Sequence, residues 1–465
     1  MTSPLAKHQV EGIAWIKEVK RGLLGDEPGL GKSRVAIEAF KDLDRILVIA
    51  PSMVISGGTW DDELAKWAGD RASHFTIAPY SMLNARDKTA TKGTKPAKRL
   101  RDEYRGHWDA IVVDEAHYTK GRKTSWTWAV EELSKNSDHV LEMTGTPMPN
   151  WAHELFTMLR VIWPGEARGG GLYGSYWRWV HEWFDTSPSP FSTHASVIGG
   201  LKKCTLLCLR RPSHDPCSHF DTFTARNMGP RFLRRLRDEC LDLPELTTQV
   251  IRVEMNKNQK KMYNELKNEL VTETSAGEEL VAWSNGSKQV LLDRLTTSDW
   301  LLDSKTGVPT GGKFDQLKYD LESRSRPTLV LAHYRTTVEA CVGVATSLGL
   351  TASAVHGGIG TSAKTQAIAD FKAGKLDVLV GSLETLAEGL TLTAADMAIF
   401  VEMSYKPSRN EQAKYRIHRM GQTRPVTVKE YVTPRTVDER KRRLLAEKTD
   451  QQMRVLNAKQ FLDLV

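Results

Sequence analysis

Short, nearly continuous apolar runs recur along the chain, and longer segments with helical periodicity separate them. The runs are RILVIAP at 45–51, AIVVD at 110–114, PTLVLAH at 327–333 and DVLVG at 377–381. Continuous apolar runs of this length predict strands buried on both faces, which is typical of parallel sheets with helical connections. We therefore predict an α/β protein with a parallel sheet in each half of the chain, covered by helices on both faces.

The most informative polar stretch follows the first apolar approach and reads LLGDEPGLGKS at 23–33. Gly29 and Gly31 allow a tight loop, and the residues from Ser33 onward can form a helix, so backbone N–H groups would surround a polyphosphate. In such a loop Lys32 reaches the β- and γ-phosphates, and the Ser33 hydroxyl ligates Mg²⁺. Asp26 stands where the strict pattern has its first glycine.

Acidic and hydroxyl side chains follow two further predicted strands. The run AIVVDEAH at 110–117 presents Asp114, a candidate Mg²⁺ ligand, and Glu115, which can orient or deprotonate the attacking water. Thr144 and Thr146 follow the strand VLEM and can link the nucleotide site to a second surface. Upstream, Gln9 has the donors and the acceptor to read an adenine edge.

Composition narrows the class without deciding it. The chain has 465 residues, a formal net charge of +8 and five cysteines. It is long enough for two to four domains. The positive charge is compatible with a polyanionic partner, and the few cysteines suit a reducing compartment. No apolar run reaches the roughly 18 residues of a membrane span, and the N-terminus lacks a signal-peptide core, so we expect a cytoplasmic protein.

Two segments carry hypotheses with an open alternative. Residues 86–105 are rich in Lys and Arg and form either a loop that tracks phosphates or a solvated hairpin. A second segment holds cysteines and histidines at close spacing, which are residue types that zinc prefers as ligands. It lacks a C-x2-C pair, and its first two cysteines would fit the buried face of a helix equally well. Its members are Cys204, Cys208, Cys217 and His219, with His214 between them.

The ordered motifs resemble the Snf2 group of superfamily 2 helicase-like ATPases. They are LAKHQVEGIAW, DEPGLGKS, LVIAPSMVISGGTWDDELAKW, DEAH, TGTPMPN, GSLETLAEGLTLTAAD and QAKYRIHRMGQTRPVTVKEYV. The match is best to the compact branch that includes fork-remodelling annealing helicases. It implies two RecA-like lobes that use ATP and Mg²⁺ and bind double-stranded DNA, and it places helical protrusions between the lobes. The implied divisions are 1–160, 161–310, 311–440 and a C-terminal helical brace at 441–465.

The resemblance also assigns roles in the second half. Arg416 and Arg419 are expected on one face of a helix, as arginine fingers that stabilise charge on the γ-phosphoryl group. The candidate contacts to the DNA backbone, all independent of base sequence, are Arg335, Gly357, Gly358, Ser382 and Thr385. The chain departs from the family pattern at His8, Tyr405 and Tyr415, none of which removes a charged catalytic group.

The expected function is a DNA-stimulated ATPase that translocates on duplex DNA. Remodelling or annealing DNA and displacing bound protein are candidate tasks, and forked or branched DNA is a candidate substrate. The alternatives are a helicase that separates DNA or RNA strands and a nucleotide-gated DNA-binding module without turnover. We expect a monomer with no membrane partner, from a bacterial or phage-infected cell.

Overall fold

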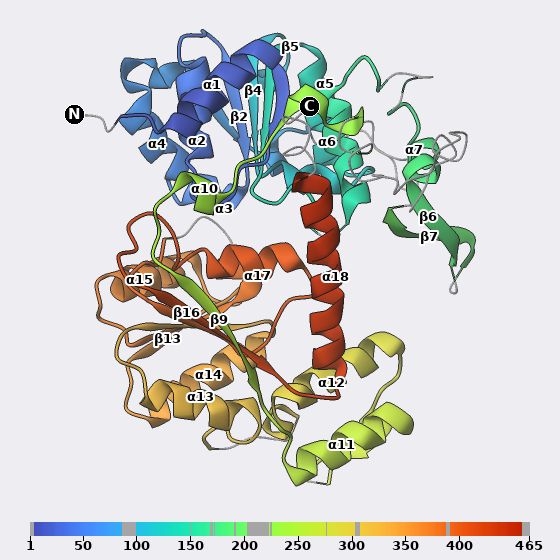
Figure 1. The fold of residues 1–465 in the computed structure, drawn as a ribbon, viewed down its shortest axis with the longest axis vertical. Coiled ribbons are helices and arrows are strands. Elements are labelled where there is room, and N and C mark those ends of the chain that lie inside the picture. The colour runs from blue at the N-terminus through green and yellow to red at the C-terminus, as the bar shows by residue number, and fades with distance from the viewer. Residues whose placement is uncertain are drawn as a thin grey trace. The chain divides into compact units, whose positions relative to one another are not determined.

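The computed structural model describes the greater part of the chain. The described residues are 4–85, 99–149, 151–167, 171, 173–189, 192–201, 223, 226–275, 277–302, 307–386 and 391–457. The chain folds into two compact units (Figure 1). The first comprises Met1–Leu241 with Lys448–Val465, and the second comprises Asp242–Glu447.

The first unit is built on a six-stranded sheet in the order β3-β2-β4-β5-β1-β8, in which all neighbouring strands are parallel. Its strands are β1 (Arg21–Leu24), β2 (Ile46–Ala50), β3 (Phe75–Pro79), β4 (Trp108–Asp114), β5 (Ser137–Met143) and β8 (Phe232–Leu233). Its helices are α1 (Lys7–Val19), α2 (Lys32–Phe40), α3 (Ser52–Ser56), α4 (Thr59–Trp67), α5 (Ser125–Lys135), α6 (Phe156–Ile162), α7 (Tyr176–Trp183) and α10 (Arg237–Cys240).

Alternate residues of each central strand enter two separate cores. On β2, Leu47 and Ile49 pack into the core that α5 and α6 cover, whereas Ile46 and Val48 pack into the core under α1, α2 and α4. Side chains of a strand point to opposite faces with period two, so a strand buried on both faces must be apolar at every position. The continuous apolar runs of the sequence are the consequence.

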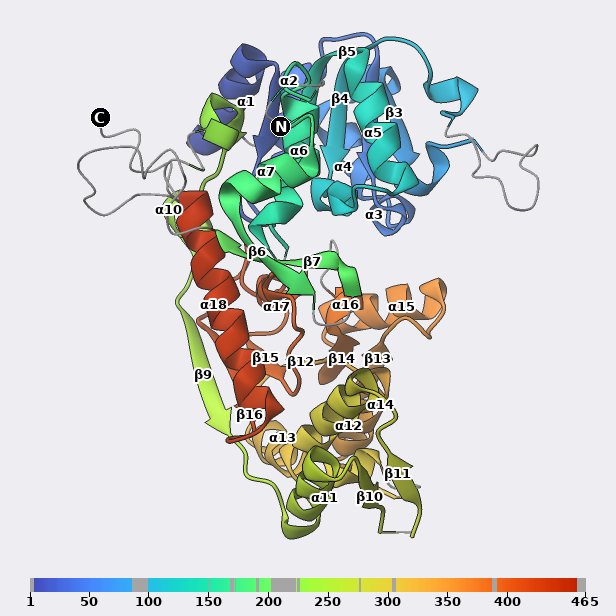
Figure 2. The same ribbon diagram turned by 90° about the vertical axis from the view of Figure 1, so that its right-hand side faces the viewer.

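An aromatic cluster extends the first core toward a hairpin of β6 (Phe184–Ser189) and β7 (Ser192–Leu201), which Figure 2 shows as a two-stranded ribbon. Trp179 and Trp183 of α7 are fully buried, and both pack against Phe223. Buried indoles of this kind stabilise a core and present no face for stacking on bases.

The second unit repeats the architecture, with a parallel sheet in the order β13-β14-β12-β15-β16-β9. Its strands are β9 (Leu246–Arg252), β12 (Thr328–Ala332), β13 (Ala352–Val355), β14 (Val378–Ser382), β15 (Met397–Phe400) and β16 (Val426–Val432). Its helices are α13 (Lys313–Glu322), α14 (Arg335–Ser347), α15 (Thr361–Lys372), α16 (Leu383–Leu386) and α17 (Pro407–Lys414). Two cores again lie on opposite faces of the sheet, one including α13 and α14 and the other α15 and α17.

A small third core supports the helices outside this sheet. It joins α11 (Lys257–Asn268), α12 (Asn285–Thr297) and the first turn of α18 (Val437–Asn457) through Met262, Leu266, Leu292, Leu295 and Val437. A hairpin of β10 (Val271–Glu273) and β11 (Glu279–Val281) connects α11 to α12.

The two parallel sheets with helices on both faces confirm the predicted α/β fold class. The interval 161–310, for which the sequence predicts helical protrusions and a linker, differs from that description. It contains strands as well as helices, and one of these strands, β9, pairs along its whole length with β16 in the second sheet. Residues 161–241 belong to the first unit and 242–310 to the second. Among the described residues, no helix is long and apolar enough to cross a membrane.

Candidate active site

The glycine-rich loop connects β1 to α2 at the carboxyl edge of the first sheet, where parallel α/β sheets bind their ligands. Gly29 and Gly31 have φ angles of 96° and 76°, a backbone conformation that residues with a Cβ adopt at a cost. At Gly31 a Cβ would also lie 2.5 Å from Gln9 Nε2. The backbone conformation therefore favours glycine at position 31, and a larger residue there would also displace the Gln9 side chain.

Lys32 begins α2, and its ammonium lies inside the loop. Lys32 Nζ donates to the carbonyl oxygens of Asp26 at 2.7 Å and Glu27 at 3.3 Å. Burial lowers the pKa of Lys32, while the charges of Glu115, Asp26 and Asp114 act in the opposite direction. Lys32 thus lies close enough to the acids of the loop and of the end of β4 for their charges to affect its pKa.

Asp26, at the position of the missing glycine, has a structural role. Its side chain is fully buried (0% exposed) and accepts hydrogen bonds from Arg235 N at 3.0 Å and Arg235 Nε at 3.1 Å. The Arg235 guanidinium also donates to the His8 carbonyl oxygen. Nearby, Arg234 Nη1 donates to the Gly25 carbonyl oxygen at 2.7 Å. The arginine-rich segment after β8 therefore holds the first half of the phosphate loop in place.

Sequence reasoning missed this contact. The signals were present separately, as an acid in a glycine position and a run of arginines about 200 residues later, 209 apart for the Asp26–Arg235 pair. Nothing in the spacing indicates that they meet.

We expect Arg235→Ala to destabilise the first unit. Removing one partner of a buried ion pair leaves an uncompensated charge, at a cost of about 3–5 kcal/mol. Thermal or denaturant unfolding of Arg235→Ala, Asp26→Ala and the double variant measures this. The double variant should be less destabilised than the sum of the two single variants, and strict additivity would contradict the coupling.

Asp114 is the last residue of β4, and three polar groups donate hydrogen bonds to it. Trp60 Nε1 donates to its Oδ2 at 3.0 Å, the Glu115 backbone N–H donates to its Oδ1 at 3.0 Å, and Tyr80 OH donates to its main-chain oxygen at 2.7 Å. Burial, together with the neighbouring Glu115 charge, raises the pKa of Asp114 to about 7. A cation beside this carboxylate would favour its charged form, as expected of a Mg²⁺ ligand.

Glu115 follows with a left-handed backbone, φ 50°, which is uncommon for a residue with a side chain and is typical of functional sites. Thr144 Oγ1 donates to Glu115 Oε2 at 3.3 Å, and His117 Nδ1 lies 3.2 Å from the same oxygen. Thr144 Oγ1 is in turn 3.0 Å from His117 Nδ1 and accepts from the Thr146 N–H at 3.1 Å. Of the two predicted coupling residues, Thr144 therefore contacts the predicted general base directly, and Thr146 contacts Thr144.

Gln9 and His8 lie beside the loop on α1 and are buried. Gln9 Nε2 donates to the Leu30 carbonyl oxygen at 3.4 Å, and His8 Nε2 lies 3.0 Å from the same atom. His8, one of the departures from the family pattern, thus makes a polar contact to the loop backbone. Gln9 is positioned by the loop, and its role toward adenine stays a prediction.

In the second unit, the predicted DNA contacts gather along one edge of the sheet. Arg335 and the pair Gly357 and Gly358 follow β12 and β13, while Ser382 ends β14 and Thr385 lies just beyond it. These three strands are neighbours, so their carboxyl ends meet at the same edge.

Two further observations show that these residues lie close together. A Cβ on Gly358 would lie 2.7 Å from Arg335 Nη1, and Ser382 Oγ donates to Thr385 Oγ1 at 2.9 Å. The exposed Arg335 is paired with Glu339, its Nε lying 2.9 Å from Glu339 Oε1.

The prediction that Arg416 and Arg419 share a helical face is wrong. Helix α17 ends at Lys414, and the chain continues in turns whose bonds include Arg416 N to Ala413 O and Gln422 N to Arg419 O. Backbone carbonyl groups that would accept hydrogen bonds in a continued helix accept them from other residues instead. The Arg416 carbonyl oxygen accepts from the Leu392 N–H at 2.8 Å, and the Ile417 oxygen accepts from the Gln422 amide at 3.0 Å.

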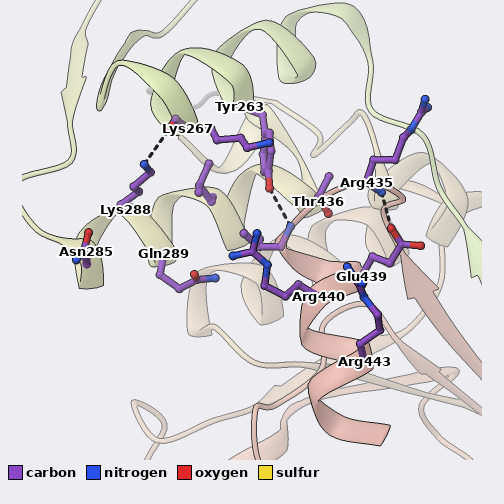
Figure 3. Close-up of a pocket in the computed structure, with 12 residues that line it drawn as sticks. Tyr263, Lys267, Asn285, Lys288, Gln289, Arg435, Thr436, Glu439, Arg440 and Arg443 are labelled. Atoms are coloured by element: carbon purple, nitrogen blue, oxygen red, sulfur yellow. Dashed lines mark hydrogen bonds between the residues drawn. The ribbon is translucent and has the colours of Figure 1, made fainter. Parts of the chain in front are cut away.

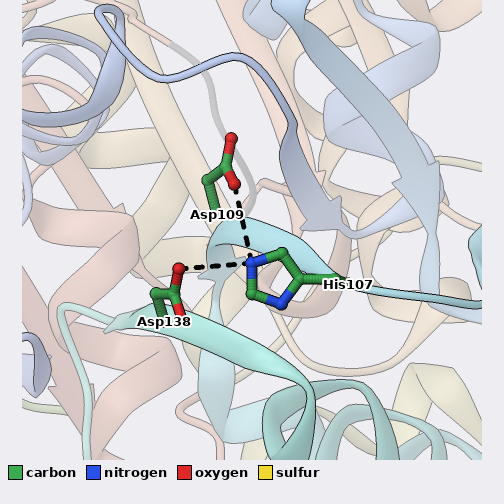
Figure 4. Close-up of side chains that lie close together, drawn as sticks. All are labelled: His107, Asp109 and Asp138. Carbon is green, nitrogen blue, oxygen red and sulfur yellow. Dashed lines mark hydrogen bonds and ion pairs between the residues drawn. The ribbon is translucent and has the colours of Figure 1, made fainter.

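Two remaining hypotheses, on zinc and on the basic segment, concern residues that lie largely outside the described part of the chain. These are the zinc candidates Cys204, Cys208, Cys217 and His219, and residues 86–98 of the basic segment. Within the described ranges, one group has metal-ligand geometry, namely His107, Asp109 and Asp138 (Figure 4). His107 Nε2 lies 3.2 Å from Asp138 Oδ2 at the amino ends of β4 and β5, opposite the edge that carries Asp114. Asp109 already accepts two backbone N–H groups there.

A parallel α/β unit with a glycine-rich phosphate loop, a lysine inside it and an Asp-Glu pair beside it defines a P-loop nucleoside triphosphatase. The donor set fits a magnesium nucleotide. Lys32 and the loop amides suit phosphate, and Ser33 and Asp114 offer hard oxygen ligands.

The chain belongs to the SNF2-related domain family, whose model matches residues 8–297, and a helicase conserved C-terminal domain matches residues 312–421. Together the two matches assign the chain to the Snf2 group of helicase-like ATPases.

Curated relatives agree with this family. The chain is 23% identical over 457 residues to the human DNA annealing helicase and endonuclease ZRANB3, covering 94% of this chain and 39% of that protein. It is 24% identical over 501 residues to the nuclear protein STH1/NPS1 of Saccharomyces cerevisiae, covering 98% and 35% respectively. The chain thus spans well under half the length of these relatives. The solved SWI2/SNF2 ATPase core of Sulfolobus solfataricus in complex with dsDNA is 21% identical, with a TM-score of 0.40 over 96% of this chain and 92% of that chain.

Proposed function

We propose that this chain is a DNA-stimulated ATPase that translocates on double-stranded DNA without sequence specificity. The observation that carries the proposal is the site in the first unit, where Lys32, Asp114 and Glu115 lie within electrostatic reach and Thr144 contacts Glu115. Lys32 and the loop amides bind and orient the phosphates, Ser33 and Asp114 hold Mg²⁺, and Glu115 takes the proton of the attacking water. ATP with Mg²⁺ supplies the phosphoanhydride bond whose cleavage releases free energy.

The assignment of DNA as the partner is supported by the groups at the edge of the second sheet. Arg335, the open backbone at Gly357 and the hydroxyls of Ser382 and Thr385 are donors suited to phosphate oxygens. None of these groups distinguishes one base from another. Relatives in the family are named as DNA annealing helicases and chromatin-remodelling subunits, which makes duplex DNA the first polymer to test.

Arg416 and Arg419 complete the proposed cycle. In the closed state they stabilise the charge that develops on the γ-phosphoryl group, and after hydrolysis they withdraw. Alternate closing and opening, with each unit gripping a backbone strand, moves the protein along the duplex. Monomeric action, forked or branched DNA as the preferred substrate, and zinc at the cysteine-histidine group are further parts of the proposal.

One experiment separates this function from its alternatives. ATP turnover is measured without polymer and then with duplex DNA, forked DNA, single-stranded DNA and RNA. Stimulation by duplex DNA supports the translocase. Stimulation by RNA or single strands alone would favour a strand-separating helicase, and DNA binding without turnover would favour a nucleotide-gated binding module. Metal analysis of the purified chain tests zinc.

DNA affinity should fall steeply with salt and vary little with base sequence. Each neutralised phosphate contributes roughly 0.9 to the log–log slope for duplex DNA. Arg335→Ala should therefore lower the slope by about 0.9, whereas Arg326→Ala, at an exposed arginine paired with Asp396, should leave it unchanged. Fluorescence anisotropy over a salt series provides both slopes.

The same assay tests the basic segment, through Ala at Lys88, Lys92, Lys95 and Lys98. An unchanged slope in that variant would mean that the basic segment is solvated and does not contact the DNA backbone. A strong preference for one base sequence would contradict the backbone model as a whole.

A further inference from the structure

A basic pocket lies in the second unit, and none of its described lining residues is among those assigned above to nucleotide or to DNA. It has a volume of about 520 Å³ and lies between α11, α12 and the start of α18 (Figure 3). Among the described residues that line it, five are basic and one, Glu439, is acidic. The basic residues are Lys267, Lys288, Arg435, Arg440 and Arg443.

Several of these charges are not neutralised by the protein. Among the residues that the structure describes, no carboxylate forms an ion pair with Lys267, Arg440 or Arg443. The acid in the pocket is already engaged, because Glu439 Oε2 accepts from the Arg435 N–H at 3.0 Å. Cationic groups gathered in a concave site raise the local concentration of anions.

Three contacts join the helices that form the walls, two of them buried and one made by a basic side chain of the pocket. Tyr263 OH accepts from the Val437 N–H at 2.8 Å, which joins α11 to α18. Lys441 Nζ lies 3.2 Å from the Asp293 carboxylate with both side chains buried, which joins α12 to α18. Lys288 Nζ donates to the Lys267 carbonyl oxygen at 2.7 Å and joins α12 to α11. The cavity is therefore preformed, which spares a ligand the cost of ordering it.

The backbone at the rim is consistent with a functional site. Arg435 has a φ angle of 61°, a left-handed conformation that favours glycine or asparagine. The Arg435 guanidinium itself pairs with Glu254, its Nη2 lying 3.5 Å from Glu254 Oε2, so the free positive charge of the pocket comes from the other basic residues.

We propose that this pocket binds two or more neighbouring phosphate groups. A preformed concave site of this volume is within the range of ligand pockets, and arginine guanidinium groups match phosphate oxygens in two-bond geometry. Arg440 and Arg443 lie three residues apart on α18 and so project on the same side of the helix. The phosphates belong either to a free polyphosphate or to a nucleic-acid backbone. The pocket does not depend on the ATP site.

Lysine footprinting tests the site without interference from the phosphate loop. The intact chain is acetylated with and without inorganic tripolyphosphate, and acetylation at each lysine is measured by mass spectrometry. Lys267 should be protected severalfold, whereas Lys260, exposed on the same helix and outside the pocket, should not. A second arm replaces tripolyphosphate with a short DNA duplex. Protection by the duplex assigns the site to a nucleic-acid backbone, and protection by tripolyphosphate alone assigns it to a free polyphosphate.

A matched pair of variants on α18 completes the test. Arg443→Ala removes a pocket charge, and Arg442→Ala removes a neighbouring charge that pairs with Glu430 outside the pocket. Arg443→Ala should raise the probe concentration needed for half-protection of Lys267 about tenfold, and Arg442→Ala should leave it nearly unchanged. Equal effects of the two variants, equal protection of Lys260 and Lys267, or no protection by either probe would overturn the proposal.

Discussion

Lys32→Ala and Glu115→Gln should each abolish ATP hydrolysis while the chain stays folded and still binds DNA. Lys32 lies inside the phosphate loop and bonds only loop carbonyls in the described structure, so its loss removes charge facing the phosphates. Glu115 is half-buried beside Thr144 and His117, and the amide in Glu115→Gln keeps the shape but cannot accept a proton. The loss of turnover should be on the order of a hundredfold or more. Steady-state phosphate release with saturating duplex DNA measures it.

The chain offers matched controls for both substitutions. Lys41→Ala removes a lysine just after the end of α2, where it pairs with Glu38, and Glu132→Gln changes an acid on α5 that pairs with Lys135. Both controls should retain turnover within about twofold, because ion pairs that water can reach contribute little and neither pair lies at the site. Near-normal turnover in Lys32→Ala or Glu115→Gln would refute the site assignment, provided that thermal unfolding matches the parent chain.

The sheets and the phosphate loop were predictable from sequence because their signals are local. Residues 46–50 are apolar at every position, and each of them is fully buried in the structure. Gly31 and Lys32 form a short motif whose geometry is set within a few residues. A strand buried on both faces and a loop around a phosphate each restrict residue choice at adjacent positions, so the pattern survives in a single sequence.

The contacts that support the site were not predictable, because they join residues far apart in the chain. In the sequence Asp26 is only a departure from the glycine pattern, and the structure shows that it accepts a hydrogen bond from Arg235. Strand β9 lies in a stretch for which the sequence predicts helical protrusions, and only its pairing with β16 shows that it belongs to the second sheet. The residues QAKYRIHR have helical propensity throughout, yet the Arg416 carbonyl bonds Leu392, and the helix ends at Lys414. In each case tertiary contact overrides local preference.

Arg419→Ala should reduce turnover far more than ATP affinity. A finger contact forms in the closed state and acts on the transition state, so its loss lowers kcat while ground-state binding is largely kept. The expected loss of turnover is about a hundredfold or more, since a positioned arginine contributes that much to phosphoryl transfer. Arg416→Ala should show the same split together with a lower Tm. Arg416 is only 7% exposed, and its Nε donates to the Leu386 carbonyl oxygen at 3.2 Å, so this variant also removes a buried contact within the second unit.

The two arginines therefore differ as probes, and Arg419, which is half-exposed, is the cleaner one. ATP affinity, DNA-stimulated kcat and Tm are measured for Arg416→Ala, Arg419→Ala, Arg419→Lys and the neighbouring control Met420→Ala. Met420 is 59% exposed, so its truncation tests disturbance of the turn without loss of charge. Arg419→Lys should recover part of kcat, because the lysine keeps the charge but not the planar donor geometry. Equal losses of affinity and turnover in Arg419→Ala would mean that this side chain holds ground-state nucleotide, and a loss of turnover in Met420→Ala would assign the effect to the turn itself.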